Sequence, residues 1–315
     1  ASRTATGSAF AYSAASVASG SLKVHDKLNP LGVKFRESRD SKEHPNSNAI
    51  GIILDVTGSN IQAATVIQKK LGQLMALLLK KSYIEDPQIL FAATGDATCD
   101  EVPIQVGQFE SGLEIDNQLD LFILEGNGGG QTPPTESYEL LMYFMARHTS
   151  IDCLEKRGKK GYVFLIGDEN PYPKVDRKLV KELIGDDLEA DISVEDIAEE
   201  LKEKYETFFI IPESSSHGKD PAIHRRWSKL FGQNVIKLSD ADAICETIAL
   251  AIGVAEGKVD TDTGAKDLID VGADRKMVSV ATSALVPYSK SRGSVALVGK
   301  VEGELVTGTP SIGKL

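Results

Sequence analysis

Asn48-Ala-Ile-Gly-Ile-Ile-Leu-Asp-Val-Thr-Gly-Ser59 is the segment that decides the fold. Its apolar run, residues 49–54, is short and unbroken, and it ends at a carboxylate that two hydroxyl residues follow at alternate positions. Unbroken apolar runs of this length are typical of strands buried on both faces, as in parallel sheets. We therefore predict a central parallel strand whose carboxyl end carries polar side chains.

Helical and strand-like segments alternate along the chain up to residue 254. Helical spacing of apolar residues follows the first strand at 61–81 and recurs at 116–124, 136–147, 194–205, 221–230 and 241–254. Strand-like runs lie between them at 88–92, 102–109, 161–166, 207–211 and 235–238. Because right-handed crossovers leave few other arrangements, this alternation predicts a doubly wound α/β domain over 47–257, with a mostly parallel sheet and helices on both faces.

The two ends of the chain differ from this pattern. Residues 1–46 are rich in Ser, Ala and Gly and then charged, without a sustained period, which predicts an extended N-terminal arm. Residues 258–315 contain runs at 277–285 and 294–305 that predict a β-rich C-terminal extension. An arm of this composition is expected to be ordered only where a partner or a lattice holds it, so self-assembly through the arm and the tail is a further expectation.

Three loops that leave predicted strand ends carry oxygen donors, and ligands of open parallel sheets bind at these ends. Carboxylates and hydroxyls are the donors that Mg²⁺, Mn²⁺ and Ca²⁺ prefer, whereas zinc and copper favour other ligands. With two acids and three hydroxyls, an ion would keep excess positive charge and open positions for a carboxylate of a partner. The donors are Asp55, Thr57 and Ser59 in the first loop, Thr132 in the second, and Asp168 in the third.

The order and spacing of these three motifs resemble the von Willebrand factor A family with its metal-ion-dependent adhesion site. The resemblance covers about 47–257 and implies that Asp55, Thr57, Ser59, Thr132 and Asp168 hold Mg²⁺, or Mn²⁺ or Ca²⁺. It also implies that a protein partner presents an Asp or Glu to the ion. The segments 103–110, 124–130 and 161–173 look like little-characterised proteins of this family from bacteria and their phages.

The chain departs from the family pattern at two places. Gln131 separates the glycines from Thr132, and Gly167-Asp-Glu169 stands where Thr-Asp-Gly is commoner. Each motif also has a simpler interpretation, since Asp-x-Thr-Gly-Ser alone more often caps a helix and Asp168 alone suits an Asx turn. Their co-occurrence favours the metal site. Asp96 and Glu169 are candidates for the rim of the ligand site, although surface turn acids are a simpler account of such residues.

Two other functions compete with metal-dependent binding. A haloacid-dehalogenase-like phosphatase also has an Asp at the end of its first strand, but it requires a second Asp where this chain has Thr57, which cannot act as the acid or base. Catalysis is therefore not expected. A structural assembly protein of a phage particle or a large intracellular complex, acting through its arm and tail, stays open and is compatible with metal binding.

Composition narrows the partners and the compartment. The chain has 35 Lys and Arg against 46 Asp and Glu, and its acidic middle disfavours nucleic-acid binding by the core. A run of about 18 apolar residues and a secretory start are both missing, which predicts a cytoplasmic protein without a membrane partner, or a virion-associated one if phage-encoded. Cys99, Cys153 and Cys245 are widely separated, which argues against a disulfide framework or a zinc site.

Overall fold

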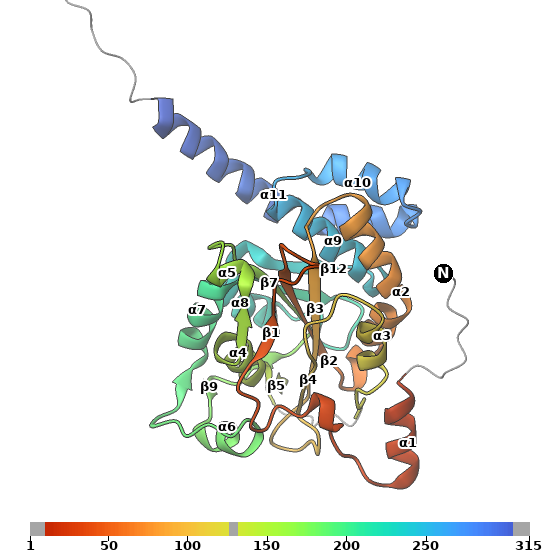
Figure 1. Cartoon of the computed structure of the whole chain (residues 1–315), viewed down its shortest axis with the longest axis vertical. Coiled ribbons are helices and arrows are strands. Elements are labelled where there is room, and N and C mark those ends of the chain that lie inside the picture. The colour runs from red at the N-terminus through yellow and green to blue at the C-terminus, as the bar shows by residue number, and fades with distance from the viewer. Residues whose placement is uncertain (1–9, 126–131, 305–315) are drawn as a thin grey trace, which may run out of the picture.

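Strand β2 (Asn48–Asp55) lies in the middle of a six-stranded sheet in the computed structural model (Figure 1). Residues 10–125 and 132–304 are described, with backbone only for Ser59 and 294–304. The strand order is β12-β11-β7-β2-β3-β4, and every pair is parallel except β3 with β4. The other strands are β3 (Pro87–Thr94), β4 (Ile104–Val106), β7 (Gly161–Ile166), β11 (Tyr205–Pro212) and β12 (Val235–Leu238). The predicted doubly wound, mostly parallel sheet is confirmed.

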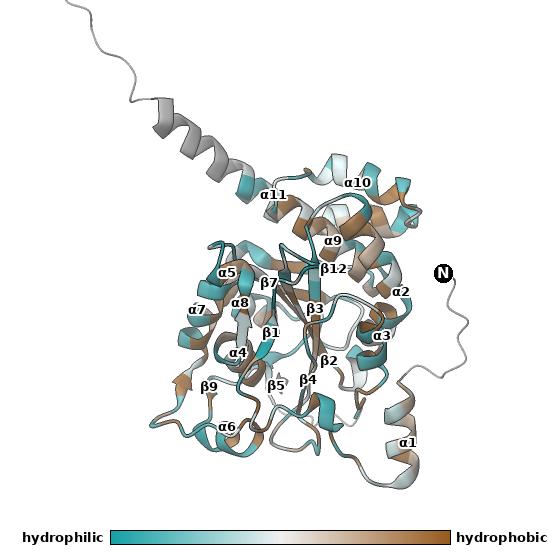
Figure 2. Cartoon of the chain, in the orientation of Figure 1, coloured by the Kyte–Doolittle hydropathy of each residue, from teal (hydrophilic) through white to brown (hydrophobic). Residues whose placement is uncertain are grey.

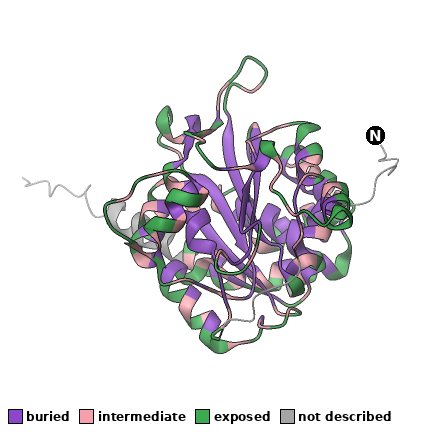
Figure 3. Cartoon of the chain, turned by 90° about the horizontal axis from the view of Figure 1, so that it is seen from below, coloured by how far each residue is buried: buried purple, intermediate pink, exposed green. Residues whose placement is uncertain are grey.

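The central strands are buried along their whole length, as the apolar run predicted. Every residue of β2 and β3 is buried, and Figure 3 shows these strands enclosed by elements whose outer surfaces are exposed. Gly51 lies under the covering helix, and a Cβ there would lie 2.7 Å from Cε of Met145. A larger residue at this position would therefore displace the end of the Met145 side chain.

Helices cover both faces of the sheet, and Figure 2 shows hydrophobic residues along the strands between them. One face packs against α2 (Ile61–Lys80), α3 (Glu114–Leu119), α9 (Ile244–Ala255), α10 (Thr261–Asp270) and α11 (Arg275–Glu304). The other face packs against α4 (Tyr138–Arg147), α6 (Arg177–Leu183), α7 (Val194–Lys204) and α8 (Pro221–Phe231).

Short elements complete the fold at the edges of the sheet. Three two-stranded pairs join β1 (Arg36–Ser38) to β6 (Thr149–Ile151), β5 (Thr135–Glu136) to β8 (Asn170–Pro171), and β9 (Lys174–Val175) to β10 (Ile192–Ser193). The short helices are α1 (Ala11–Ser19), α5 (Asp152–Glu155) and the 3-10 turns Asp26–Leu28, Gly58–Asn60, Gly232–Asn234 and Ala241–Ala243.

The prediction of a β-rich C-terminal extension was wrong. Residues 261–270 and 275–304 form helices α10 and α11. Met277, Ala281, Leu285 and Tyr288 recur at helical spacing and are buried against the first face of the sheet. The two runs were predicted to be β-like, whereas the spacing of the buried residues in the first run is helical and decides the structure.

The prediction of an extended N-terminal arm was wrong for much of residues 10–46. Ala11–Ser19 is a helix, β1 pairs with β6, and Phe10 and Leu28 are buried against the domain. Ser13 accepts a hydrogen bond from the backbone N of Leu124, which ties the first helix to the domain. An alanine-rich segment forms a helix readily, but nine residues are too few to show a period in the sequence. Residues 1–9 lie outside the described part of the chain.

None of the helices within 10–125 and 132–304 is both long enough and apolar enough to cross a membrane.

Candidate metal site

The topology of the sheet places two sequence motifs at one crevice. From β2 the chain passes outward to β3 and β4, and then returns to β7 on the other side of β2. In folds of this topology the loops that leave two such strands diverge, and the region between the loops after β2 and β7 is named the crevice. Asp55 is the last residue of β2, and Asp168 lies two residues beyond the end of β7. The crevice is where ligands bind in folds of this topology.

Asp55 and Asp168 are brought together, as predicted. Both side chains are fully buried, and a single nitrogen, Nδ2 of Asn60, lies 2.9 Å from Oδ2 of Asp55 and 2.5 Å from Oδ1 of Asp168. The other oxygen of Asp168 accepts a hydrogen bond from the backbone N of His217 at 2.7 Å. Two carboxylates from separate strands thus share one neutral amide group.

Asp55 also binds the hydroxyl that was predicted to accompany it. Its Oδ1 accepts hydrogen bonds from the backbone N of Thr57 at 2.9 Å and from Oγ1 of Thr57 at 2.6 Å. Its Oδ2 accepts a further bond from the hydroxyl of Tyr138 at 2.9 Å. These contacts form an Asx-type turn, and among the described side chains neither Thr57 nor Asn60 caps the helical segment that follows it. The alternative interpretation of Asp55 as a helix cap is therefore wrong.

Two predicted ligands remain, Ser59 and Thr132. Each lies in its predicted loop, but the structure does not show its hydroxyl group beside Asp55. The backbone of Ser59 belongs to the turn Gly58–Asn60, and its side chain lies outside the description. Thr132 is exposed and makes no hydrogen bond with Asp55 or Asp168 among the described residues. Its loop nevertheless lies beside the third loop, because Pro134 O accepts a hydrogen bond from the N of Asn170 at 3.0 Å and β5 pairs with β8. The glycines at 128–130 and Gln131 fall outside the described residues.

More acids surround Asp55 than the sequence motifs indicated. Glu136 and the predicted rim residue Asp96 are almost fully buried, and each has one carboxylate oxygen without a hydrogen-bond partner among the described residues. The predicted rim residue Glu169 is half-buried, and its carbonyl accepts the indole N–H of Trp227. Trp227 itself is fully buried, as expected of a packing residue.

Burial and mutual repulsion make these acids hard to ionise. Burial raises the pKa of Glu136 to about 10, and the nearby charge of Asp55 acts in the same direction. Burial, together with Asp55, raises the pKa of Glu169 to about 7. The pKa of Asp55 also rises to about 7, because burial and Asp168 outweigh its hydrogen bonds from Thr57 and Tyr138. Within the described residues, neither Asp55 nor Asp168 forms an ion pair with Lys or Arg.

The structure explains one departure from the family pattern. A Cβ at Gly167 would lie 1.9 Å from the hydroxyl oxygen of Tyr138 and 2.8 Å from its Cζ. Because that hydroxyl donates to Asp55, Tyr138 fills the space beside position 167 and leaves no room there for a side chain such as that of Thr. Sequence reasoning missed Tyr138 and Asn60, and the one signal for Asn60 was its position directly after the first motif.

A divalent cation fits the donors that the crevice presents. Across the described ranges, no three His, Cys, Asp or Glu side chains are grouped so as to hold an ion by themselves. The donor set here is different, since two carboxylates lie with the Thr57 hydroxyl, and both kinds of group offer hard oxygen, whereas the Asn60 amide turns its nitrogen toward the carboxylates. Oδ1 of Asn60 is buried without a hydrogen-bond partner among the described residues, so the crevice also contains an oxygen whose bonding capacity is unused.

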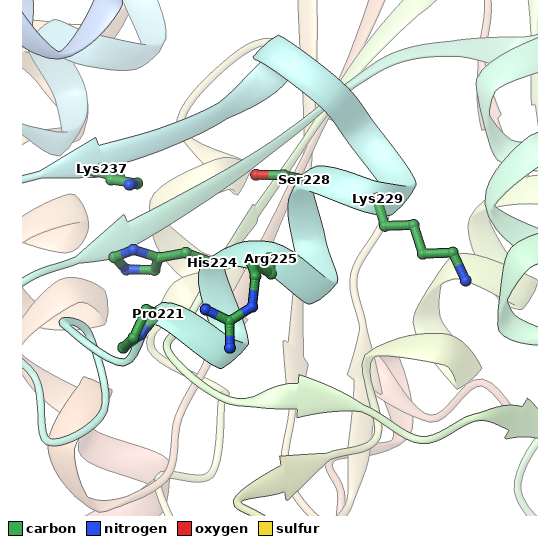
Figure 4. A pocket seen from close by; sticks show the side chains of 6 residues that line it. All are labelled: Pro221, His224, Arg225, Ser228, Lys229 and Lys237. Atoms are coloured by element: carbon green, nitrogen blue, oxygen red, sulfur yellow. The ribbon is translucent and has the colours of Figure 1, made fainter.

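A basic hollow lies apart from these residues, on α8 and β12 (Figure 4). It is open, has a volume of about 440 Å³ and contains none of the predicted ligands. Its lining residues are Pro221, His224, Arg225, Ser228, Lys229 and Lys237. Charged lysine and arginine side chains are donors only and have no lone pair for a metal ion, so the hollow is not the predicted site.

Comparisons with known proteins show limited likeness. No family model and no curated protein matches the chain. The pilus adhesin SpaC of Lactobacillus rhamnosus GG, in its open conformation, is similar over 69% of this chain and 31% of the adhesin, with 9% identity and a TM-score of 0.46. The chain thus spans about a third of the adhesin's length. An aerotolerance-related membrane protein of Bacteroides fragilis is similar over 67% of this chain and all of that chain, with 13% identity and a TM-score of 0.34.

Proposed function

We propose that the chain is a von Willebrand factor A-like module that binds a divalent cation and uses it to capture an acidic residue of a protein partner. Asp55, Thr57 and Asp168 would hold the ion, and Ser59 and Thr132 would complete its ligands from the same loops. The observation that carries the proposal is the meeting of two fully buried carboxylates on one neutral amide. Mg²⁺ is the expected ion, with Mn²⁺ or Ca²⁺ as substitutes.

The electrostatics of the crevice support a cation. Two buried carboxylates repel each other, and burial penalises their charged forms unless an opposite charge compensates them. A bound divalent ion would supply that charge and an open position where a partner's carboxylate completes the coordination. Asp55 and Asp168 would orient the ion, while Tyr138 and Asn60 hold the carboxylates in position.

The surrounding acids would make partner binding strictly dependent on the ion. The charge of Asp55 raises the pKa of Glu136 and of Glu169, so these acids lie near it. An acidic side chain entering the crevice without a cation would therefore meet Asp55 and Asp168 with no Lys or Arg paired to either carboxylate among the described residues. Repulsion of this kind costs several kcal/mol at an interface. The proposal therefore includes complete loss of binding in chelator, rather than a graded weakening.

We expect no catalysis from this site. The position that a magnesium-dependent phosphatase would give to its second acid is Thr57, whose hydroxyl donates to Asp55. A hydroxyl in that position cannot move protons as a carboxylic acid does near neutral pH.

The experiment is a calorimetric titration of Mg²⁺ into the wild-type protein, into Asp55→Ala and into Asp187→Ala. Asp187 is an exposed acid that forms a surface ion pair with Lys181, so its variant controls for general loss of negative charge. Heat of binding is expected from the wild type and the control, and none from Asp55→Ala. Equal binding by all three proteins would refute the site. A pull-down with and without chelator then tests whether partner capture depends on the ion.

A further inference from the structure

Asn60 occupies the position between the two carboxylates, and the sequence motifs gave it no role. It is the last residue of the turn Gly58–Asn60 and is 2% exposed. Its Nδ2 contacts Asp55 and Asp168, while its Oδ1 has no hydrogen-bond partner among the described residues. A role for Asn60 in ion binding rests on the proposed function, because it presupposes a cation between these two carboxylates.

The position of the amide nitrogen matches that of a metal ligand. Mg²⁺ binds oxygen atoms at about 2.1 Å in octahedral geometry, so neighbouring ligand atoms are about 3.0 Å apart. Nδ2 of Asn60 lies 2.9 Å from Oδ2 of Asp55, which matches that separation, and 2.5 Å from Oδ1 of Asp168, which is shorter. An oxygen atom at this place would adjoin both carboxylates, as a further ligand of an ion held by them would.

The atom at that place is a nitrogen, which cannot be a ligand in this form. An amide NH₂ group only donates hydrogen bonds, whereas the carbonyl oxygen of the same amide accepts them and binds hard cations. The two ends of the amide have nearly the same size, and a half-turn about the last side-chain torsion exchanges them without moving the backbone. Such a half-turn would carry the unpartnered Oδ1 into the place that Nδ2 holds.

We propose that Asn60 is a further ligand of the cation and that its amide turns over when the ion binds. In the ion-free protein, the NH₂ group bridges Asp55 and Asp168 and offsets part of their repulsion. With the ion present, an unturned NH₂ group would point its protons at a positive charge, which is unfavourable. The turned amide presents Oδ1 to the ion instead. The turn breaks no hydrogen bond of Oδ1, because that oxygen has none among the described residues.

The Asn60 amide therefore has a different role in each state, because it bridges the two carboxylates when the ion is absent and binds the ion when it is present. Asn60 contributes to holding the two loops together in both states, first as a donor to the carboxylates and then as a ligand beside them. Asparagine is suited to this position because it carries both a donor and an acceptor on one planar group. Aspartate would supply only acceptors, and leucine, which has the same number of side-chain heavy atoms but is larger, would supply neither.

The test uses Mn²⁺ as the probe ion and the full chain. Electron-nuclear double resonance on protein labelled with ¹³C at the side-chain carbonyl of asparagine reports a carbon coupling only when an asparagine oxygen binds Mn²⁺. The coupling is expected in the wild type and is expected to be lost in Asn60→Leu. Since the wild-type spectrum needs no variant, it stays decisive even if a variant fails to fold. A wild-type protein that binds Mn²⁺ without this coupling overturns the inference.

Affinities measured in parallel separate this inference from the proposed function. Asn60→Leu is expected to bind Mn²⁺ about 10- to 100-fold more weakly than the wild type, whereas Asn60→Asp is expected to bind at least as tightly. An Asn60→Leu protein that binds as tightly as the wild type, or more tightly, would show that the amide only obstructs the ion. If the wild type binds no Mn²⁺, or Asp55→Ala binds it equally well, the proposed function itself fails.

Discussion

Replacing Gly167 by alanine should disturb the crevice through Tyr138. The added methyl group would lie 1.9 Å from the tyrosine hydroxyl and 2.8 Å from Cζ, distances that no van der Waals contact permits. Tyr138 cannot retreat easily, because its ring packs edge-on against Phe209 and Trp227 and is fully buried. Overpacking of this kind costs about 1–3 kcal/mol. We expect the free energy of unfolding to fall by about 2–3 kcal/mol, toward the upper end of that range.

A double-mutant cycle isolates the contact between the two side chains. Tyr138→Phe removes the hydroxyl and its bond to Asp55, and a lost hydrogen bond to a buried charged group costs about 1.5–3 kcal/mol. In Gly167→Ala/Tyr138→Phe the shortest collision is gone, and the distances to the ring carbons, 2.8 and 3.1 Å, need only a small shift. The double variant should therefore lose less stability than the sum of the single variants, by about 1 kcal/mol or more.

Urea denaturation of the four proteins in chelator measures this coupling. If the two losses add within about 0.5 kcal/mol, the side chains do not interact and the explanation of Gly167 is wrong. Gly167→Ser serves as a matched control, since its Cβ meets the same hydroxyl and it should also lose stability. Both single variants should weaken Mg²⁺ binding, because residues that orient ligands typically change metal affinity by about 10- to 100-fold.

Three further predictions concern charge. Mg²⁺ at about 100 times its dissociation constant should raise the wild-type melting temperature by about 4 °C in calorimetry, and an equal rise in Asp168→Asn would contradict the site. Burial raises the pKa of Glu139 from 4.5 to about 8, so wild-type stability should fall as the pH rises from about 4.5 to 8, by up to about 5 kcal/mol. Glu139→Gln should lack this fall in urea titrations, and a pH profile parallel to that of the wild type would disprove it. Nζ of Lys70 lies 3.0 Å from Oε1 of the fully buried Glu246, so Lys70→Met should lower the free energy of unfolding by about 3 kcal/mol. Adding Glu246→Leu to the same chain should restore most of that stability, and absence of this rescue would refute the pairing.

The sheet could be predicted because its strands are buried on both faces. A surface helix would have polar residues on the side that faces solvent, and runs such as 49–54 and 161–166 have none. Their short length and the residues at their ends therefore identify them as buried strands. The C-terminal helix α11 was not predicted, although Val278 and Leu285 lie seven residues apart, which is a helical spacing and not the even spacing of one strand face. Both residues are buried in the cluster that contains α9, against which α11 packs. Helix α1 is stabilised by contacts with residues 120 and 124, far along the chain, which no local pattern reveals.

The site was predictable only to the extent that its residues lie on strand ends. Asp55, Thr57 and Asp168 meet because the strands that carry them are neighbours, and neighbouring parallel strands follow from the alternation of elements. Asn60, Tyr138 and Glu136 take part for other reasons: one begins a helix, and the others lie where α4 enters the crevice. Their positions depend on how helices pack on the sheet, which the sequence pattern does not specify.

The additional acids around the crevice affect how selective the proposed module would be for its partner. Two carboxylates alone would leave a bound ion with excess charge, and any nearby acidic residue could then reach it. Glu136 and Asp96 are buried with unpartnered oxygens among the described residues, so the chain already contains carboxylates near the position that a partner's acid would take. Under the proposed function, a partner would need contacts beyond its carboxylate in order to compete, and the exposed Thr132 is a residue that we propose for such contacts. Selectivity of the module would then arise from the rim, while the ion supplies the requirement for an acid.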